Sequence, residues 1–332
     1  MRLAKWLLAA LLLWSFFWAA AAWGLRQGIT GWFAERVRHG WQAELTGMET
    51  AGYPLRHELR LLNPALADPG TGAAWRAEWL ELESPAIWPG YQRLRFPPAP
   101  QRLSYFDQTV EIAAEGLTAV LRLAPGTALT LEEMALEAAG WEIRQDGTVV
   151  LGGSALQAQM VQGEAPETYR ITAEAKDFAP RAAWRRRLAA ASDLPPAFDT
   201  LALDMEVFFD AAWDRAALEQ RRPQPRRIAL KLADARWGDL RLKATGTLTI
   251  DETGLPQGSL ALQAEEWRGL LAMAERAGSL PPAIRAPLER VLSLFAGTGG
   301  TRETLDITLN FSDGMAMLGP LPLGPAPRLV LR

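Results

Sequence analysis

The 332-residue chain contains no cysteine and only two histidines, His39 and His57. Without cysteine it can form neither a disulfide nor a thiolate-ligated metal site, and two histidines nearly exclude a multi-histidine metal centre. The lack of disulfides does not identify the compartment, because many exported proteins have none. A net charge of −3 predicts no general attraction to nucleic acid, so we expect no nucleic-acid partner.

Familiar catalytic motifs are also missing. The sequence has no Gly-x-Ser-x-Gly elbow, no His-Glu-x-x-His and no Gly-x-x-x-x-Gly-Lys phosphate loop. His57 alternates with leucines, which is typical of a satisfied core or edge histidine, and no nucleophile accompanies it. Glu132 and Glu133 are adjacent, so in a strand their carboxylates would point to opposite faces and be solvated. We therefore predict that the protein is not an enzyme and has no cofactor.

What the chain does have is a long apolar N-terminus. Arg2 and Lys5 precede an uncharged run from Trp6 to Gly24, and about 20 such residues can cross a bilayer as a helix. The positive end should stay in the cytoplasm, and Trp6 and Trp23 should lie near the two membrane interfaces. We predict that residues 1–26 are a transmembrane signal anchor in the inner membrane, with the body in the periplasm.

A cleaved signal peptide is the alternative, with Ala20-Ala21-Ala22 as its cleavage site and a soluble periplasmic product. The anchor is favoured because the apolar run is longer than a typical signal core and the helical pattern continues beyond it. We predict that residues 27–47 form an amphipathic helix leaving the membrane. Its aromatic face, with Trp32 as a further interface residue, predicts either membrane-proximal packing or contact with a partner helix.

Beyond Gly47 the dominant hydrophobic period is two, as in pleated strands. Residues 240–250 are the clearest case, since apolar residues alternate there with arginine, lysine and threonine. Turn signals at 145–150, 251–258 and 311–318 predict antiparallel hairpins. Helices are too few for a parallel α/β sheet. The predicted fold is mainly β (β-rich α+β), an elongated, curved, largely antiparallel sheet with a few amphipathic helices.

The chain also predicts an internal duplication. Strand-like runs precede two similar stretches, 176–196 and 265–282, and both stretches end in Leu-Pro-Pro. We expect helices near 181–191 and 265–277, with Trp267 equivalent to Phe178, and a weaker helix at 210–220. We expect Arg185-Arg186-Arg187 to form the solvent-exposed face of the first helix rather than to contact anionic lipid headgroups. The β-rich domain, 48–332, would thus contain two similar units at about 141–209 and 237–311.

A packing argument points to a binding surface. Roughly a dozen strands each offer an apolar face that must lose contact with water, and a few short helices cannot cover them. These faces either bind a ligand in an open groove, for which lipid or acyl chains are the natural occupants, or pack on each other in a closed core. The second reading describes a structural scaffold with envelope-protein partners. The proline-rich end, 319–329, would close the sheet edge. The groove candidates are Leu242, Leu248, Ile250, Leu260 and Leu262.

Four stretches resemble a known family. They are GWQAEL…AGYPLRHEL (40–59), ELESPAIWPGYQ (81–92), WGDLRLKATGTLTIDETGLPQGSLALQAEEW (237–267) and DGMAMLGPLPLGPAPRL (313–329). They are similar to the alphaproteobacterial membrane-anchored family called domain of unknown function 2125, which has no assigned activity. The strand-rich pattern behind an anchor also resembles, more remotely, the AsmA-like envelope proteins. That likeness implies a curved sheet with an apolar groove and a link to lipid movement or outer-membrane assembly.

Overall fold

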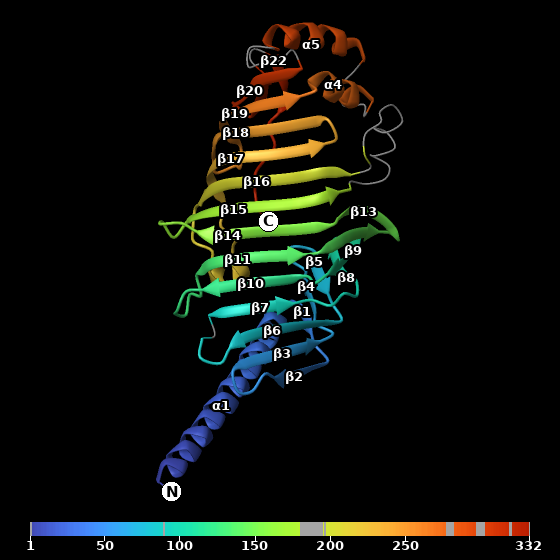
Figure 1. The fold of residues 1–332 in the computed structure, drawn as a ribbon. Helices are drawn as coiled ribbons and strands as arrows, with labels where there is room; N and C mark the ends of the chain where they lie inside the picture. Colours follow the sequence, from blue (N-terminus) through green and yellow to red (C-terminus); the bar gives the residue numbers. More distant parts are fainter. Residues whose placement is uncertain are drawn as a thin grey trace.

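The computed structural model describes residues 2–88, 90–179, 195, 197–276, 282–296, 303–318 and 321–331. A long helix, α1 (Arg2–Arg38), leads into an elongated body of stacked strands, and two helices cap the far end (Figure 1). The capping helices are α4 (Trp267–Arg276) and α5 (Pro282–Phe295), and a short α3 (Arg215–Glu219) lies in a connection.

The body is built around a 15-stranded antiparallel sheet in the order β2-β3-β6-β7-β10-β11-β14-β15-β16-β17-β18-β19-β20-β21-β22. This confirms the predicted strand-rich, antiparallel fold behind an apolar helix. The strands are β2 (Gly47–Ala51), β3 (Arg56–Leu62), β6 (Trp79–Pro85), β7 (Tyr91–Arg95), β10 (Thr118–Leu123), β11 (Leu131–Ala138), β14 (Ala155–Gln162), β15 (Thr168–Phe178), β16 (Phe198–Phe209), β17 (Pro225–Trp237), β18 (Leu240–Ile250), β19 (Pro256–Glu265), β20 (Thr304–Ser312), β21 (Met315–Leu318) and β22 (Leu321–Pro325).

A second, 7-stranded sheet folds back beside the lower part of the long one (Figure 1). Its order is β1-β4-β5-β8-β9-β12-β13. It forms because three long hairpins bend so that their bases lie in the long sheet and their tips in the short one. For example, β3 of the long sheet passes into β4 of the short sheet within a few residues. The strands are β1 (Gln42–Glu44), β4 (Ala65–Asp68), β5 (Ala73–Arg76), β8 (Gln101–Tyr105), β9 (Gln108–Glu115), β12 (Gly140–Gln145) and β13 (Thr148–Gly153).

The three hairpin turns predicted from sequence are confirmed. Asp146 and Gly147, at the β12–β13 turn, both have positive φ (51° and 72°), as a two-residue turn of this kind requires. Asp313 and Gly314 repeat this between β20 and β21, with φ of 53° and 72°. In the β18–β19 turn, the Asp251 carboxylate accepts hydrogen bonds from the backbone of Thr253 and Leu255.

The helix predicted to continue to residue 47 is shorter than expected. It ends at Arg38, and residues 42–44 and 47–51 are strands rather than helix. Gly40 adopts φ 87°, while the Trp41 amide donates to the Arg36 carbonyl and the Gly40 amide to the Val37 carbonyl. This is the Schellman arrangement that commonly ends a helix at a glycine.

Two of the predicted body helices can be compared with the structure. The helix at 265–277 is confirmed as α4, and the weaker one at 210–220 shortens to α3, where Asp214 caps the amides of Ala216 and Ala217. The second Leu-Pro-Pro starts a helix that was not predicted, because Pro282 is the first residue of α5. Proline suits that position since its missing N–H would be unpaired anyway. The stretch 181–191, with its three arginines, lies outside the described residues.

The division into two similar units stays a prediction. One feature of the register supports it, since Ala175 and Ala264 lie in the same row across the sheet, through Leu201, Ala235 and Leu242. Phe178 and Trp267 each follow that row by three residues.

Candidate functional site

One unbroken apolar row crosses the long sheet. Residues directly opposite each other in antiparallel strands share a face, and the register links twelve apolar residues from β3 to β20. Leu59, in β3 at the end of the row nearest α1, is buried. The other residues are half-buried, so the row is open along most of its length. Twelve strands at about 4.8 Å spacing make it ~50 Å long. We call this row the apolar strip: Leu59, Leu82, Leu94, Ala119, Leu136, Ala158, Ala173, Leu203, Ala233, Ala244, Leu262 and Ile307.

On one side the strip is bounded by a closed core. Tyr169, Val207 and Phe209 pack under the connection that carries Trp213. Leu248 and Ile250 continue this core and are covered by the C-terminal segment through Ala326 and Leu329. The apolar face is therefore sealed along this flank.

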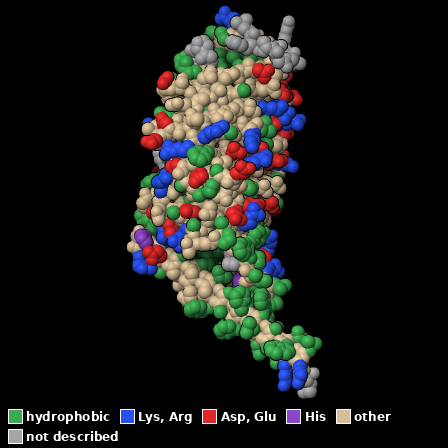
Figure 2. Space-filling view, turned by 90° about the vertical axis from the view of Figure 1, so that its left-hand side faces the viewer, with side chains coloured by type: hydrophobic (Ala, Val, Ile, Leu, Met, Phe, Trp, Pro, Cys, Tyr) green, Lys and Arg blue, Asp and Glu red, His purple; other side chains and the backbone are tan. Residues whose placement is uncertain are grey.

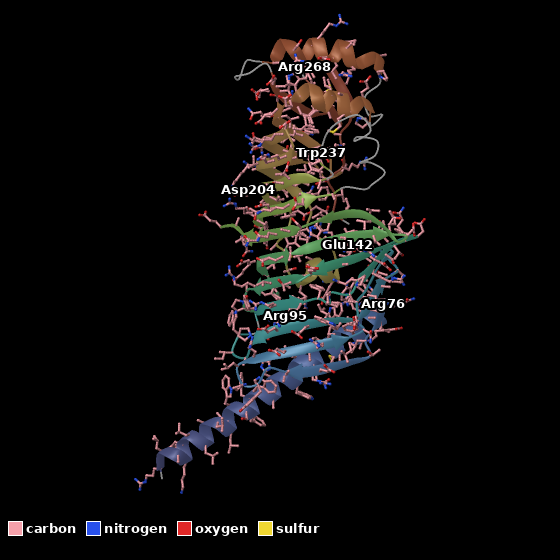
Figure 3. The ribbon with its side chains drawn as sticks, turned by 45° about the vertical axis from the view of Figure 1, so that its right-hand side comes forward. Arg76, Arg95, Glu142, Asp204, Trp237 and Arg268 are labelled. Carbon is pink, nitrogen blue, oxygen red and sulfur yellow. The ribbon has the colours of Figure 1, made fainter. Side chains whose placement is uncertain are left out.

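On the other side stands a ladder of aromatic rings. Trp141, Phe178, Phe198 and Trp237 follow one another with centroids 6.1, 6.0 and 4.6 Å apart. Figure 3 shows Trp237 just below the helical cap that carries Arg268. Between this ladder and the strip runs a second apolar row, in which Leu242 is 40% exposed. The two flanks make the strip the floor of a groove.

Two cavities lie over the strip. One, of about 270 Å³, is lined by Leu203, Ala233 and Leu242 among others. The other, of about 750 Å³, is lined by Leu262 and Ile307 and by three apolar residues of α5, Leu288, Val291 and Leu292. Residues of the adjacent polar row, among them Lys243, Gln263 and Asp306, also line it. Ala244 lines both, so the cavities adjoin.

The opposite face of the same strands is polar. The row next to the strip begins Arg60, Glu81, Arg95 and carries charged or amide side chains across most of the sheet. Glu81 pairs with both arginines at 2.8 and 3.2 Å. Further along, the Arg170 guanidinium hydrogen-bonds Asp204 and lowers the pKa of that carboxyl. Figure 3 shows Arg95 and Asp204 along one side of the body, and Arg76 and Glu142 of the second sheet on the other. The exposed Arg170–Asp204 pair contributes little stability, whereas Glu81 is itself buried against its two arginines.

The five predicted groove residues all lie on the apolar face, but only some are accessible. Leu262 lies in the strip and Leu242 in the row beside it. Leu260 is half-buried against the closed core. Leu248 and Ile250, 8% and 5% exposed, are inside that core. The C-terminal segment covers these two, which the strand pattern alone could not show.

The predicted interface tryptophans fall in two settings. Trp6 and Trp23 are exposed on α1. Trp32 instead lies on the part of α1 that packs on the body, where it and Trp41 flank the Arg36 guanidinium at 5.7 and 5.8 Å. Phe33 is buried beside it.

The apolar helix also packs on the sheet, a contact that was not predicted. The Trp14 indole donates to the Pro54 carbonyl (3.0 Å), and the Trp18 indole donates to the Arg56 carbonyl (2.8 Å). The only available signal was their i, i+4 spacing, which places both indoles on one helix face.

His57 is buried, as predicted, and the Trp18 ring stacks on it with centroids 5.0 Å apart. Neither ring nitrogen has a hydrogen-bond partner among the described residues, so it is not satisfied in the way expected. Burial lowers the pKa of His57. His57 lies two residues before Leu59 on the same face of β3, at the lower end of the strip.

The adjacent glutamates do not point to opposite faces as predicted, because the β10–β11 register shifts at Glu132. Glu132 and Glu133 both pair with Arg122, at 3.2 and 3.1 Å. Within the described ranges, no group of three or more His, Asp or Glu side chains could hold a metal ion.

Fold and groove together define a long antiparallel-sheet protein, open on one apolar face and led by a helix long and apolar enough to cross a membrane. The chain belongs to the DUF2125 family, described as an uncharacterized protein conserved in bacteria, whose profile matches residues 18–327. No curated protein matches the chain significantly.

Proposed function

We propose that this protein is a non-enzymatic, inner-membrane-anchored component of the cell envelope that holds lipid or acyl chains in the apolar strip. α1 acts as an uncleaved single-pass anchor, and the body lies in the periplasm because Arg2 and Lys5 keep the start of the helix in the cytoplasm.

The observation that carries the proposal is the one-sidedness of the sheet. Twelve consecutive strands contribute an apolar residue to one row, while the adjacent row on the other face is mostly charged or amide. Apolar surface left half-exposed costs free energy unless something covers it. A strip ~50 Å long exceeds the ~30 Å hydrocarbon thickness of a whole bilayer, so it has room for acyl chains end to end.

Retention of lipid tests this proposal. Native mass spectrometry of the full chain, released from mild detergent, should show bound lipid. Leu242→Glu should lose it, because an unpaired charge would lie among acyl chains. Leu242 is the suitable site because it is already 40% exposed, whereas a charge at Leu248 would break the closed core.

Thr247→Glu is the matched control, since it adds the same charge to the same strand on the exposed polar face. Circular dichroism must show that both variants keep their strand content. Equal lipid in the two folded variants would remove the groove assignment. A lipid-free wild-type protein would favour the alternative, a structural or interaction scaffold of the envelope whose apolar faces form a closed core.

A further inference from the structure

We propose that the foot of the β body, the loops 52–55 and 86–88, is embedded in the outer half of the same bilayer that α1 crosses. The inference rests on the membrane anchoring proposed above but not on lipid binding by the strip.

The freely projecting part of α1 is too short to cross a bilayer. The body holds α1 from Trp14 onward, through Pro54, Tyr53 and Arg56; the Ser15 hydroxyl and the Tyr53 hydroxyl are 2.8 Å apart. Only residues 2–13 project freely, and 12 residues at about 1.5 Å each give ~18 Å. A hydrocarbon core is ~30 Å thick. The bilayer must therefore reach up to about residue 22, past the point where the helix already touches the body.

The loops at the point where α1 touches the body are apolar and uncharged. Residues 50–55 and 84–88 contain no charge. Leu55 and Ile87 are 74% and 76% exposed, and Tyr53 and Trp88 are about half exposed. The Ala86 amide donates to the Leu55 carbonyl (2.9 Å), so the two loops form one unit. In water these side chains would be an unexplained apolar patch.

Charged residues reappear on α1 and on the body just above these loops. After Lys5 the next charged residue of α1 is Arg26, whose guanidinium donates to the Met48 carbonyl. At the foot the first charged residues are Arg56 and Glu83, and they neutralise each other at 2.9 Å. Figure 2 shows the same boundary, with green side chains on the helix and at the foot and mixed blue and red on the body above.

The distance along α1 sets how deeply the foot lies in the bilayer. From Trp14 to residue 22 is about 12 Å along the helix, close to the ~5–10 Å to which interfacial apolar elements bury. His57 lies just above the foot, followed by Leu59, the first residue of the strip. The lower end of the strip, where Leu59 is buried, would therefore lie beside the lipid surface rather than in water.

The absence of cysteine allows a direct test. Full-length protein carrying one introduced cysteine is labelled with the fluorophore NBD and reconstituted in phosphatidylcholine vesicles containing acyl-chain spin-labelled lipid. Leu55→Cys and Ile87→Cys report on the foot. Leu8→Cys reports on α1. Phe106→Cys, also an exposed apolar position but on the second sheet, is the control.

We expect the labels at 55 and 87 to be quenched at least about twofold, as at position 8, while the label at 106 is unaffected. Quenching at 8 without quenching at 55 and 87 would overturn the embedded foot and leave the anchor intact. A blue-shifted but unquenched label at 55 would mean that protein, such as a second copy, covers the foot. That result would also overturn the proposal that the foot is embedded in the bilayer. No quenching at position 8 would remove the anchoring on which both proposals depend.

Discussion

The indole of Trp18, in the apolar helix, stacks on the imidazole of His57, in the first long strand, at 5.0 Å between ring centroids. The contact joins the helix to the strand on which the strip begins. It also encloses a histidine that can take up a proton only by becoming a buried, unpaired cation.

Acid should therefore weaken the body. Because burial lowers the pKa of His57 in the folded protein, the unfolded chain binds more protons as pH falls below about 6.5. The contribution of neutral His57 to the free energy of unfolding is therefore complete above that pH. It is lost as the pH falls toward the lower pKa of His57 in the folded protein. Thermal unfolding in detergent between pH 8 and 5.5 should show this loss in the wild type. His57→Phe, which keeps a stacked ring, should show a smaller slope. Since His39 is present in both proteins, equal slopes would contradict the assignment.

The closed core and the open row beside the strip should respond differently to truncation. Leu248→Ala removes a buried side chain and should cost about 2–5 kcal/mol of unfolding free energy. Leu242→Ala, at a 40% exposed position of the same strand and face, should cost about 1 kcal/mol or less. Urea unfolding of the two variants measures both. Similar large losses would mean that the groove is closed in solution.

The Tyr169 hydroxyl should matter to the core on that flank. It donates to the Leu131 carbonyl (3.0 Å) and accepts from the Trp213 amide (3.2 Å), which ties the 210–224 connection to the sheet. Tyr169→Phe removes both hydrogen bonds from a buried site and should cost about 1–3 kcal/mol. Tyr105→Phe, at an exposed tyrosine, is the control. Equal effects of the two changes in denaturant unfolding would show that the connection is not held in this way.

A bulky side chain in the strip should reduce the amount of lipid that the protein holds. Ala244 lines both cavities, so Ala244→Trp would place a large ring where they adjoin. We expect the lipid counted by native mass spectrometry to fall to about half or less, given the bulk of the ring. Thr247→Trp adds the same ring on the polar face and should change nothing. Undiminished lipid in a folded Ala244→Trp protein would place the ligand elsewhere.

Local patterns were enough to predict the antiparallel sheet, the three hairpin turns and α4. Each depends on residues close in sequence, as with Asp146-Gly147 in a two-residue turn. The end of α1 was also readable in principle, because Gly40 marks it. The start of α5 could not be read from Leu-Pro-Pro alone, because proline is common just after a helix and is also favoured at the first helical position.

The site depended on information that the sequence does not carry locally. Alternation shows that Leu242 and Leu248 share a face, but not that the C-terminal segment folds back over only one of them. The strip itself depends on register across twelve strands, and a one-residue slip in any pair would break it. Docking of Trp18 on His57 joins residues 39 positions apart and belongs to tertiary structure.

The most direct test of the central claim is site-specific photo-crosslinking to lipid. A photoreactive phenylalanine analogue is placed singly at Leu203 and Leu262, in the strip, and at Gln157 and Thr247, which are exposed on the polar face. Full-length protein is then irradiated in vesicles containing radiolabelled phosphatidylethanolamine. We predict labelled adducts at 203 and 262 and none at 157 or 247. Equal labelling at all four positions, or none at 203 and 262, would contradict a lipid-holding groove.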